Sequence, residues 1–273
     1  MSEQTTNTGR EVPLPAHPES LEKWFGSFIE LVRILRQDCP WDRKQTHESI
    51  SHLLIEESYE TLDAISAAND DEFSKELGDL LLHVVMHSVM AEQRGAFTMR
   101  NVIEKSFHKL VHRHPHVFGN GTAHNEDDVK QRWEELKLKE GRSSILGGVP
   151  KAMPALLRAQ RMQEKAANIG FDWENRDGAW EKTEEEFREL QQEIIGGDLT
   201  KISEEFGDFL FALVNSARFA GIIAEDALQA ANQKFTRRFQ HIESEAAKAN
   251  RPLKSMTLAE MDELWNDAKR LGM

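Results

Sequence analysis

Apolar residues along most of this chain recur every three or four positions, the spacing expected of helices with one buried face. The first such stretch covers residues 21–35, and the Cys-Pro-Trp-Asp sequence at 39–42 ends it. The alternating β-branched pattern of strands does not occur, so the pattern predicts an all-α protein. The further helices that it predicts cover residues 46–68, 72–93, 98–112, 127–139, 153–168, 180–195, 199–220, 225–249 and 258–270.

Two of these predicted helices, 72–93 and 199–220, are apolar nearly all round and are expected to lie in a core. Each nevertheless carries a Glu-x-x-Asp pair, and the helix before it carries a Glu-Glu-x-x-Glu cluster. A short turn between two antiparallel helices would aim four of these carboxylates at one point, where they repel one another unless a cation lies between them. The acids that we predict to bind metal are Glu57, Glu60, Glu76 and Asp79 in the first half, and Glu186, Glu189, Glu205 and Asp208 in the second.

The kind of metal follows from the ligands on offer, which are all oxygen atoms. Di-iron helical bundles use Glu-x-x-His pairs, and neither pair here contains an imidazole. This difference favours Mg²⁺, with Mn²⁺ as a substitute. A glycine lies inside each pair, Gly78 or Gly207, at a cost of about 1 kcal/mol in helix stability. We expect it to let a neighbouring helix or a ligand come close.

Simpler explanations exist for each of these features. A single acidic cluster is usually a solvated helix face, but burial of acids in both halves would cost free energy without a cation. His83 and His87 share the face of Asp79, yet Ala212 and Ser216 replace them in the second half, so we interpret them as local packing. A zinc site remains a weaker alternative, because the second half keeps only one counterpart of the histidines concerned. These are His108, His112, His114 and His116.

The acids belong to a unit that occurs twice, offset by about 129 residues, which is far longer than the period of a solenoid. Glycine and proline residues between 141 and 154 indicate a linker. We therefore predict four segments. They are a disordered tail at 1–18, an N-terminal helical domain at 19–140, a linker at 141–152 and a C-terminal helical domain at 153–273.

Basic and aromatic residues repeat together with the acids. Mg²⁺ held by carboxylates usually takes its remaining ligands from phosphate oxygens, so nearby lysine and arginine side chains would bind phosphates and a tryptophan would stack on a base. Each residue alone would be an ordinary surface or core position, and the repetition favours ligand binding. The predicted substrate-binding residues are Lys234, Arg238, Trp265 and Lys269 in the second half, and Lys109, Arg113, Trp133 and Lys137 in the first.

Composition limits the partners and the compartment. The net charge of −13 without a basic stripe disfavours binding to a nucleic acid polymer. No apolar run of eighteen residues occurs, and the first residues lack the apolar core of a signal peptide, so we expect no membrane partner. Cys39 is the only cysteine, which suits the reducing cytoplasm. P-loop and serine or cysteine nucleophile motifs do not occur either.

The tandem acid blocks, the Cys-Pro-Trp-Asp at 39–42 and the Glu-Leu-Gly-Asp-Leu-Leu at 76–81 together resemble the MazG nucleoside triphosphate pyrophosphohydrolases. The resemblance extends over essentially the whole chain after the tail. It implies all-α helical bundles that form a homodimer, and hydrolysis of (d)NTPs to the monophosphate and pyrophosphate with Mg²⁺. It also implies that the acids and the basic residues named above contact metal and nucleotide.

The two repeats differ beside their acids. Lys182 and Lys201 lie one turn before the acids of the second repeat, where the first repeat has Leu53 and Glu72. Lysines on the carboxylate face would hold a polyphosphate, so we predict the main catalytic site in the C-terminal repeat. A metal-activated water would attack the α-phosphorus there, with one of two catalytic residues as the base. These are Glu185 and Glu186.

Two other functions remain open at this point. A non-catalytic helical module that binds Mg-nucleotide or a partner protein as a regulator would carry the same acids. A phosphohydrolase that releases orthophosphate would also carry them. Analysis of the products formed from a nucleotide mixture, with and without EDTA, separates all three.

Overall fold

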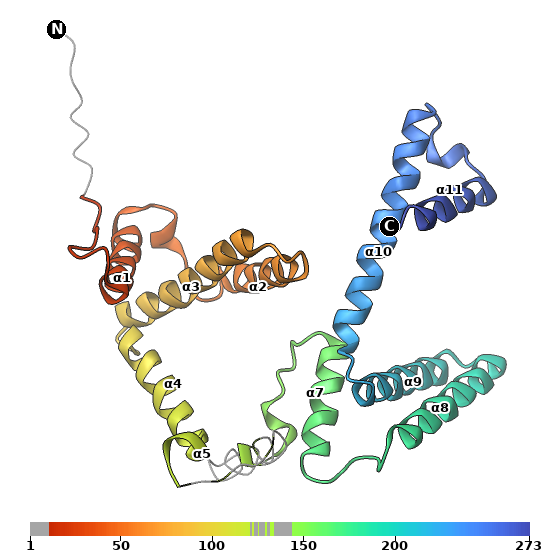
Figure 1. The fold of residues 1–273 in the computed structure, drawn as a ribbon, viewed down its shortest axis with the longest axis horizontal. Helices are drawn as coiled ribbons and strands as arrows, with labels where there is room; N and C mark the ends of the chain where they lie inside the picture. Colours follow the sequence, from red (N-terminus) through yellow and green to blue (C-terminus); the bar gives the residue numbers. More distant parts are fainter. Residues whose placement is uncertain (1–10, 121, 123–124, 126–128, 130–131, 134–143) are drawn as a thin grey trace. The chain divides into compact units, whose positions relative to one another are not determined.

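The computed structural model describes residues 11–120, 122, 125, 129, 132–133 and 144–273. The described residues form helices and turns without a β-strand, as the apolar pattern predicted (Figure 1). The chain divides into two compact units, residues 1–122 and 123–273. The predicted helix at 127–139 lies almost entirely outside the described residues, as do residues 1–10 of the predicted tail.

The first unit is built around a helical hairpin. Helix α3 packs against α2 on one side and against α1 and α4 elsewhere along its length. A buried cluster between α1 and the C-terminal half of α3 forms the core, with Val32 and Val85 fully buried. The helices are α1 (Leu21–Asp38), η1 (Asp42–Lys44), α2 (Ser51–Ser66), α3 (Asp70–Gln93), α4 (Met99–Arg113) and α5 (Pro115–Phe118).

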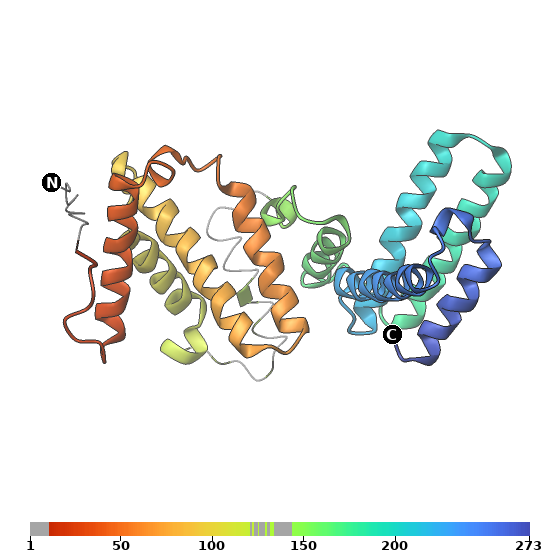
Figure 2. The ribbon, with the colours of Figure 1, turned by 90° about the horizontal axis from the view of Figure 1, so that it is seen from above.

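The second unit repeats the hairpin. Helices α8 and α9 lie side by side and antiparallel in both views (Figures 1 and 2), and α7 packs on α9. Helix α10 leaves the end of α9 at an angle of 101° and carries α11 along its side. The helices are η2 (Leu146–Gly148), α7 (Ala155–Ala167), α8 (Arg176–Gly196), α9 (Leu199–Phe219), α10 (Ala224–Lys248), η3 (Leu253–Ser255) and α11 (Leu258–Arg270).

The turns of both hairpins follow from their residues. Asn69 caps α3 by accepting a hydrogen bond from the backbone N–H of Glu72. In the second unit Gly197 ends α8 with a φ of 76°, a conformation that suits glycine, and the Asp198 side chain caps α9. Both turns are short, as the sequence predicted for the connection between the acid-bearing helices. They bring the two acid-bearing helices of each unit into contact.

Two helix starts differ from the sequence prediction by four or more residues. Helix α2 begins at Ser51 and not at residue 46, because Thr46 and Ser49 each accept a hydrogen bond from the backbone N–H of the other and form a separate turn. Helix α8 begins at Arg176, four residues before the predicted start. Asn175 accepts hydrogen bonds from the first backbone N–H groups there and caps the helix.

The two acid-bearing helices α3 and α9 are less buried than predicted. Leu77 and Val84 on α3 are 46% and 41% exposed, and Phe206 on α9 is 51% exposed. Each helix has one packed face and one apolar face that no described part of the chain covers. The all-round apolar pattern therefore does not mark a core helix of one molecule, although it is compatible with burial against another molecule.

The glycines between the acids also differ from expectation. A Cβ atom added at Gly78 or at Gly207 would meet nothing within 4 Å apart from its chain neighbours and its own helix backbone. No helix of the described chain approaches these positions, so a close neighbouring helix is not the reason for either glycine.

No single helix in the described part of the chain has the length and apolar content needed to cross a membrane. Only the bent pair α9 and α10 together meets that test of length and composition.

Candidate metal centre and adjoining cavity

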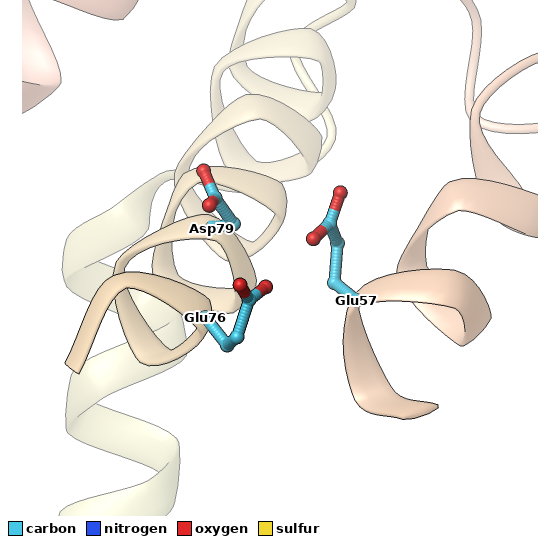
Figure 3. A group of neighbouring side chains, drawn as sticks. All are labelled: Glu57, Glu76 and Asp79. Atoms are coloured by element: carbon cyan, nitrogen blue, oxygen red, sulfur yellow. The ribbon is translucent and has the colours of Figure 1, made fainter. Parts of the chain in front are cut away.

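Each hairpin gathers three carboxylates at one point. In the first unit, oxygen atoms of Glu57, Glu76 and Asp79 all lie within 4.8 Å of one another (Figure 3). Glu57 reaches the site from α2, and the other two come from successive turns of α3. The spacing of three in Glu-x-x-Asp places the pair on the side of α3 that faces α2. The hairpin thus produces the convergence that the sequence predicted for these three acids.

The second unit reproduces this geometry. Oxygen atoms of Glu186 on α8 and of Glu205 and Asp208 on α9 also lie within 4.8 Å of one another. Within the described residues these are the two groups of three histidine, cysteine or acidic side chains that are close enough to share an ion. Neither group contains a histidine or a cysteine.

Burial of the acids is uneven. Glu76 and Glu186 are 7% and 9% exposed, whereas Asp79 and Asp208 are exposed. Each site therefore lies at the rim of its hairpin and not deep between helices, which corrects the expectation of fully buried acids. One edge is open to solvent, so a ligand larger than an ion can reach the carboxylates.

Mutual repulsion and burial raise the pKa values of several of these acids. Burial, and after it the negative charge of Glu60, raise the pKa of Glu76. In the second unit, burial followed by the charge of Glu189 raises the pKa of Glu205. Burial and then the charge of Asp79 raise the pKa of Glu57 in the same direction. Each of these three glutamates therefore takes up a proton at a higher pH than an isolated glutamate does, as expected for clustered acids without a cation.

The fourth predicted acid of each set stands apart. Glu60 and Glu189 are exposed and do not belong to the groups of three, although their charges act on the sites. Both lie one helical turn after the α2 or α8 glutamate of the site. The structure thus brings together three of the four predicted ligands in each repeat and places the fourth at the edge.

The residues present fit a hard divalent cation. Their donor atoms are all carboxylate oxygens, which suit Mg²⁺, Mn²⁺ or Ca²⁺ better than zinc or iron. Oε2 of Glu76 is buried and has no hydrogen-bond partner among the described residues. A buried carboxylate oxygen without a partner costs free energy, and a bound cation would offset that cost. The chain therefore carries an acidic site suited to a metal ion in each unit.

Among the described residues, a lysine pairs with an acid of the second site, and none pairs with the three acids of the first. Nζ of Lys182 lies 2.6 Å from Oε1 of Glu185 and 2.8 Å from Oε1 of Glu186. These two hydrogen bonds raise the pKa of the lysine, which stays positively charged. Lys201, the second predicted lysine, is exposed on the first turn of α9. At the matching positions of the first unit, Leu53 is half-buried and Glu72 pairs with Lys75.

The remaining basic residues predicted for the second repeat lie on α10 and α11. The guanidinium of Arg238 lies 5.4 Å from the ring centre of Trp265, and Phe235 contacts the same ring. Lys234 and Lys269 are exposed on the same two helices. Figure 1 shows α11 beside α10 and away from the α8–α9 hairpin, so one molecule does not gather the whole predicted set around its acids.

In the first repeat, the predicted basic set is only partly described. Lys109 is exposed on α4, and Arg113 and Trp133 are half-buried. Lys137 lies outside the described residues. His87, one of the two histidines interpreted from the sequence as local packing, contacts a histidine that precedes α2. Nδ1 of His47 lies 2.8 Å from Nδ1 of His87, and the two rings stack.

A cavity of about 560 Å³ adjoins the acids of the second unit. Its walls come from α7, the loop before α8, and the facing sides of α8 and α9. Lys182, Glu186 and Asp208 belong both to this cavity and to the charged site. The residues that sequence reasoning missed include Gln163, Asp172, Trp173, Asn215 and Arg218.

The missed residues had a weak signal in the sequence. The Gly-Phe-Asp-Trp sequence at 170–173 lies between two predicted helices, and its Asp172 and Trp173 line the cavity. Asp172 accepts a bidentate ion pair from Arg218 on α9, with Nη1 3.0 Å from Oδ2. The first repeat has Val89 at the position of Arg218, so a comparison of the repeats beyond the acids would have marked this residue as particular to the second unit.

Comparison with known proteins agrees with this geometry. The family model described as the MazG nucleotide pyrophosphohydrolase domain matches the chain twice, at residues 45–118 and 178–243. The chain is 43% identical over 250 residues to the nucleoside triphosphate pyrophosphohydrolase/pyrophosphatase MazG of Thermotoga maritima, covering 89% of this chain and 95% of that protein. It is 40% identical over 252 residues to the nucleoside triphosphate pyrophosphohydrolase of Escherichia coli K12, with the same coverage of both proteins. Both matches of the family model contain a complete carboxylate group of three, and the chain belongs to the MazG nucleotide pyrophosphohydrolase family.

Proposed function

We propose that this protein hydrolyses nucleoside triphosphates to the nucleoside monophosphate and pyrophosphate. The observation that carries the proposal is the second unit, where three converging carboxylates, a protonated lysine and a cavity for an organic group adjoin one another. Family membership and the two relatives named as nucleoside triphosphate pyrophosphohydrolases support it. Acids alone would suit a metal-binding module, but a lysine and a cavity beside them suit a phosphorylated substrate.

The three carboxylates of the second unit would hold Mg²⁺. Glu186, Glu205 and Asp208 would be ligands, and Glu189 lies near enough to support the site by its charge. When bound, Mg²⁺ supplies positive charge for the triphosphate oxygens and makes a water molecule more acidic. Mn²⁺, which accepts the same oxygen ligands, would substitute for it.

The residues around the metal have separate tasks in this reaction. A water oxygen forms a bond to the α-phosphorus while the bond from that phosphorus to the bridging oxygen of the β-phosphate breaks, and pyrophosphate leaves. Glu185 or Glu186 would accept the proton of the water. Lys182 pairs with both glutamates, and a triphosphate would compete for its ammonium group. Release from Lys182 would leave one of the glutamates free to act as the base.

The second repeat would be the main catalytic site. The first repeat has the same three acids but offers Leu53 and Glu72 in place of two lysines. A leucine and a further acid beside the carboxylates would weaken the binding of a polyanion. The first repeat would therefore bind metal and contribute little to turnover.

A homodimer would complete the site. Apolar side chains on the hairpin helices are unusually exposed, for example Phe187 at 45% on α8 and Phe206 at 51% on α9. Helix α11, which carries two of the predicted substrate-binding residues, also lies away from the α8–α9 hairpin of its own chain (Figure 1). A second copy packed on the exposed faces would bury them, and its α10–α11 pair would bring the predicted substrate-binding residues that one chain does not place at its acids. These are Lys234, Arg238, Trp265 and Lys269.

The activity is tested by identifying the products formed from a mixture of NTPs with MgCl₂ and with EDTA. We expect monophosphate and pyrophosphate in equal amounts, and neither with EDTA. Glu205→Gln should lower turnover at least a hundredfold, whereas the matched change Glu76→Gln in the first repeat should leave more than half of it. Release of orthophosphate alone, or no product at all from the folded protein, would refute the proposal.

The shared site is tested by mixing two inactive variants. Glu205→Gln lacks the metal site, and the double variant Lys234→Ala/Arg238→Ala lacks the basic pair. If each site draws on both chains, a mixed dimer contains one site with all its residues, and unfolding and refolding the two variants together should restore activity. Refolding that yields a mixed dimer without activity would show that each chain supplies both parts of its own site.

A further inference from the structure

The cavity beside the second acidic site has the size and walls of a pocket for a flat organic group. Its volume of about 560 Å³ falls within the usual range for sites of small ligands. Trp173, Phe171 and Phe211 line it together with Met162, and these side chains offer aromatic and thioether surfaces for stacking. Because the cavity shares Lys182 and the acids with the charged site, a ligand could place phosphates on one end and a ring in the other.

One wall of the cavity carries a buried acceptor without a partner. Gln163 on α7 is 8% exposed and lines the cavity. Its Nε2 donates a hydrogen bond to the backbone oxygen of Phe211 at 2.8 Å, which fixes the orientation of the amide. The other amide atom, Oε1, is buried and has no partner among the described residues. Buried polar atoms are normally paired, so this oxygen indicates a donor that arrives with a ligand.

Another part of the cavity wall is held in place by an ion pair. Arg218 binds Asp172 through two hydrogen bonds, and its side chain also donates to Asn215. The side chains of Arg218 and Asp172 are only 15% and 25% exposed. This contact ties the 170–173 loop to α9 and so keeps Trp173 at the cavity. The indole ring also lies against Gly178 at the start of α8, where a Cβ atom would come within 3.0 Å of it.

We propose that this cavity takes the base of the nucleoside triphosphate and that Oε1 of Gln163 accepts a hydrogen bond from an N–H group on the edge of the base. The proposal rests on the proposed function, because it places the base of the same substrate whose phosphates would bind at the metal site. Trp173 would stack on the ring of the base, and Gln163 would favour a base with an N–H donor at the edge that faces it. The protein would thus recognise the base through a hydrogen bond to a buried glutamine and not by stacking alone.

The ligands for the test are three triphosphates that differ only at the base. ATP carries the N6 amino group, purine riboside triphosphate lacks every N–H donor on its base, and ribose 5-triphosphate has no base. For the full-length protein we expect kcat/KM to be about tenfold higher for ATP than for purine riboside triphosphate, the effect of one hydrogen bond. Ribose 5-triphosphate should be a poorer substrate than either.

Variants then assign the difference to the glutamine. Gln163→Met keeps the volume and removes the acceptor, so we expect kcat/KM for ATP to fall about tenfold and to equal that for purine riboside triphosphate. Turnover of ribose 5-triphosphate should not change. Gln160→Met is the matched control, because Gln160 is also buried on α7 but does not line the cavity. Trp173→Ala should weaken both base-bearing substrates and leave ribose 5-triphosphate unaffected.

Each outcome decides the proposal. If Gln163→Met lowers turnover of all three triphosphates equally, the glutamine acts on the fold and the proposal is wrong. It is also wrong if no substrate is affected. Dissociation constants of the α,β-methylene analogue of ATP and of its purine riboside counterpart, measured by calorimetry on the same variants, provide a readout without turnover. A protein that hydrolyses nothing but binds the two analogues with the expected tenfold difference would refute the proposed reaction and keep the base pocket.

Discussion

Lys182 holds Glu186 in an ion pair, with Nζ 2.8 Å from Oε1, in the same hairpin where Glu186 converges with two other acids. The lysine is one helical turn before the glutamate on α8, so the pair is an i, i+4 contact. Its first-repeat counterpart, Leu53, offers no charge to Glu57. The two acidic sites therefore differ in their electrostatics although their carboxylates are alike.

Replacement of this lysine by the residue of the first repeat tests the difference. We expect Lys182→Leu to lower kcat/KM for an NTP by at least tenfold, because a positive charge beside the triphosphate is lost. Pyrophosphate release with saturating MgCl₂ measures the effect. The reverse change, Leu53→Lys, is the control and should not affect turnover of the second site. If kcat/KM is unchanged in Lys182→Leu, the lysine does not belong to the substrate site.

The raised pKa of Glu205 predicts how the metal and the pH act together. Its folded pKa lies above the ordinary 4.5, so the folded protein takes up a proton before the unfolded chain does. Without metal, the contribution of Glu205 to the unfolding free energy therefore increases as the pH falls through the folded pKa, and it levels off below 4.5. Metal binding needs the ionised form, so its stabilisation is full above the folded pKa and is lost as the pH falls through it.

Melting temperatures of wild type and Glu205→Gln, measured from pH 8 to pH 4.5 with EDTA or MgCl₂, separate these effects. We expect Mg²⁺ to raise the Tm of the wild type at pH 8 and much less near pH 4.5. In EDTA the variant should be more stable than the wild type at pH 8, because a neutral amide replaces a repelled carboxylate. Equal stabilisation by Mg²⁺ in both proteins at every pH would contradict the assignment of Glu205 as a ligand.

Local patterns in the sequence predicted most of the helices and most of the residues of each acidic site. The helices, the Asn69 and Asp198 caps and the convergence of Glu76 with Asp79 depend on spacings of a few residues. The exposure of Asp79 depends instead on how many helices cover the hairpin. That number is set by packing between distant segments, which the spacing of apolar residues does not report.

The cavity could not be predicted for a similar reason. Gln163 and Phe211 are 48 residues apart and meet because α7 packs on α9. A glutamine within an amphipathic helix has no feature that marks it as buried, so its unpaired oxygen appears only in three dimensions. Trp265 was chosen as the stacking residue because it repeats, whereas Trp173 adjoins the acids of its own chain.

The ion pair between Asp172 and Arg218 should stabilise the second unit. Both side chains are largely buried, so removal of one partner leaves the other charge without compensation. We expect Arg218→Val, which introduces the residue of the first repeat, to lower the unfolding free energy by about 2 kcal/mol. Urea unfolding of the two single variants and of Asp172→Ala/Arg218→Val gives the coupling energy. The double variant should lose clearly less than the sum of the singles, and strict additivity would show that the pair is not coupled.

The contact between His47 and His87 should make the first unit sensitive to acid. Burial, and after it the positive charges of His47 and His83, lower the pKa of His87 below its ordinary value of 6.5. The unfolded chain therefore takes up a proton near pH 6.5 while folded His87 stays neutral. The contribution of His87 to the unfolding free energy is full above pH 6.5 and is lost progressively as the pH falls through 6.5 toward the folded pKa.

Urea unfolding of the wild type and of His87→Ser, the residue of the second repeat, at pH 7.5 and pH 5.5 tests this sign. We expect the wild type to lose more unfolding free energy between the two pH values than the variant does. His52→Ser, at an exposed position on α2, is the control and should behave like the wild type. Since the cavity and Lys182 belong to the second unit, pyrophosphate release at pH 7.5 should be the same for all three proteins. A larger acid effect in His87→Ser than in the wild type would mean that the folded protein binds the proton at this position more readily than the unfolded chain.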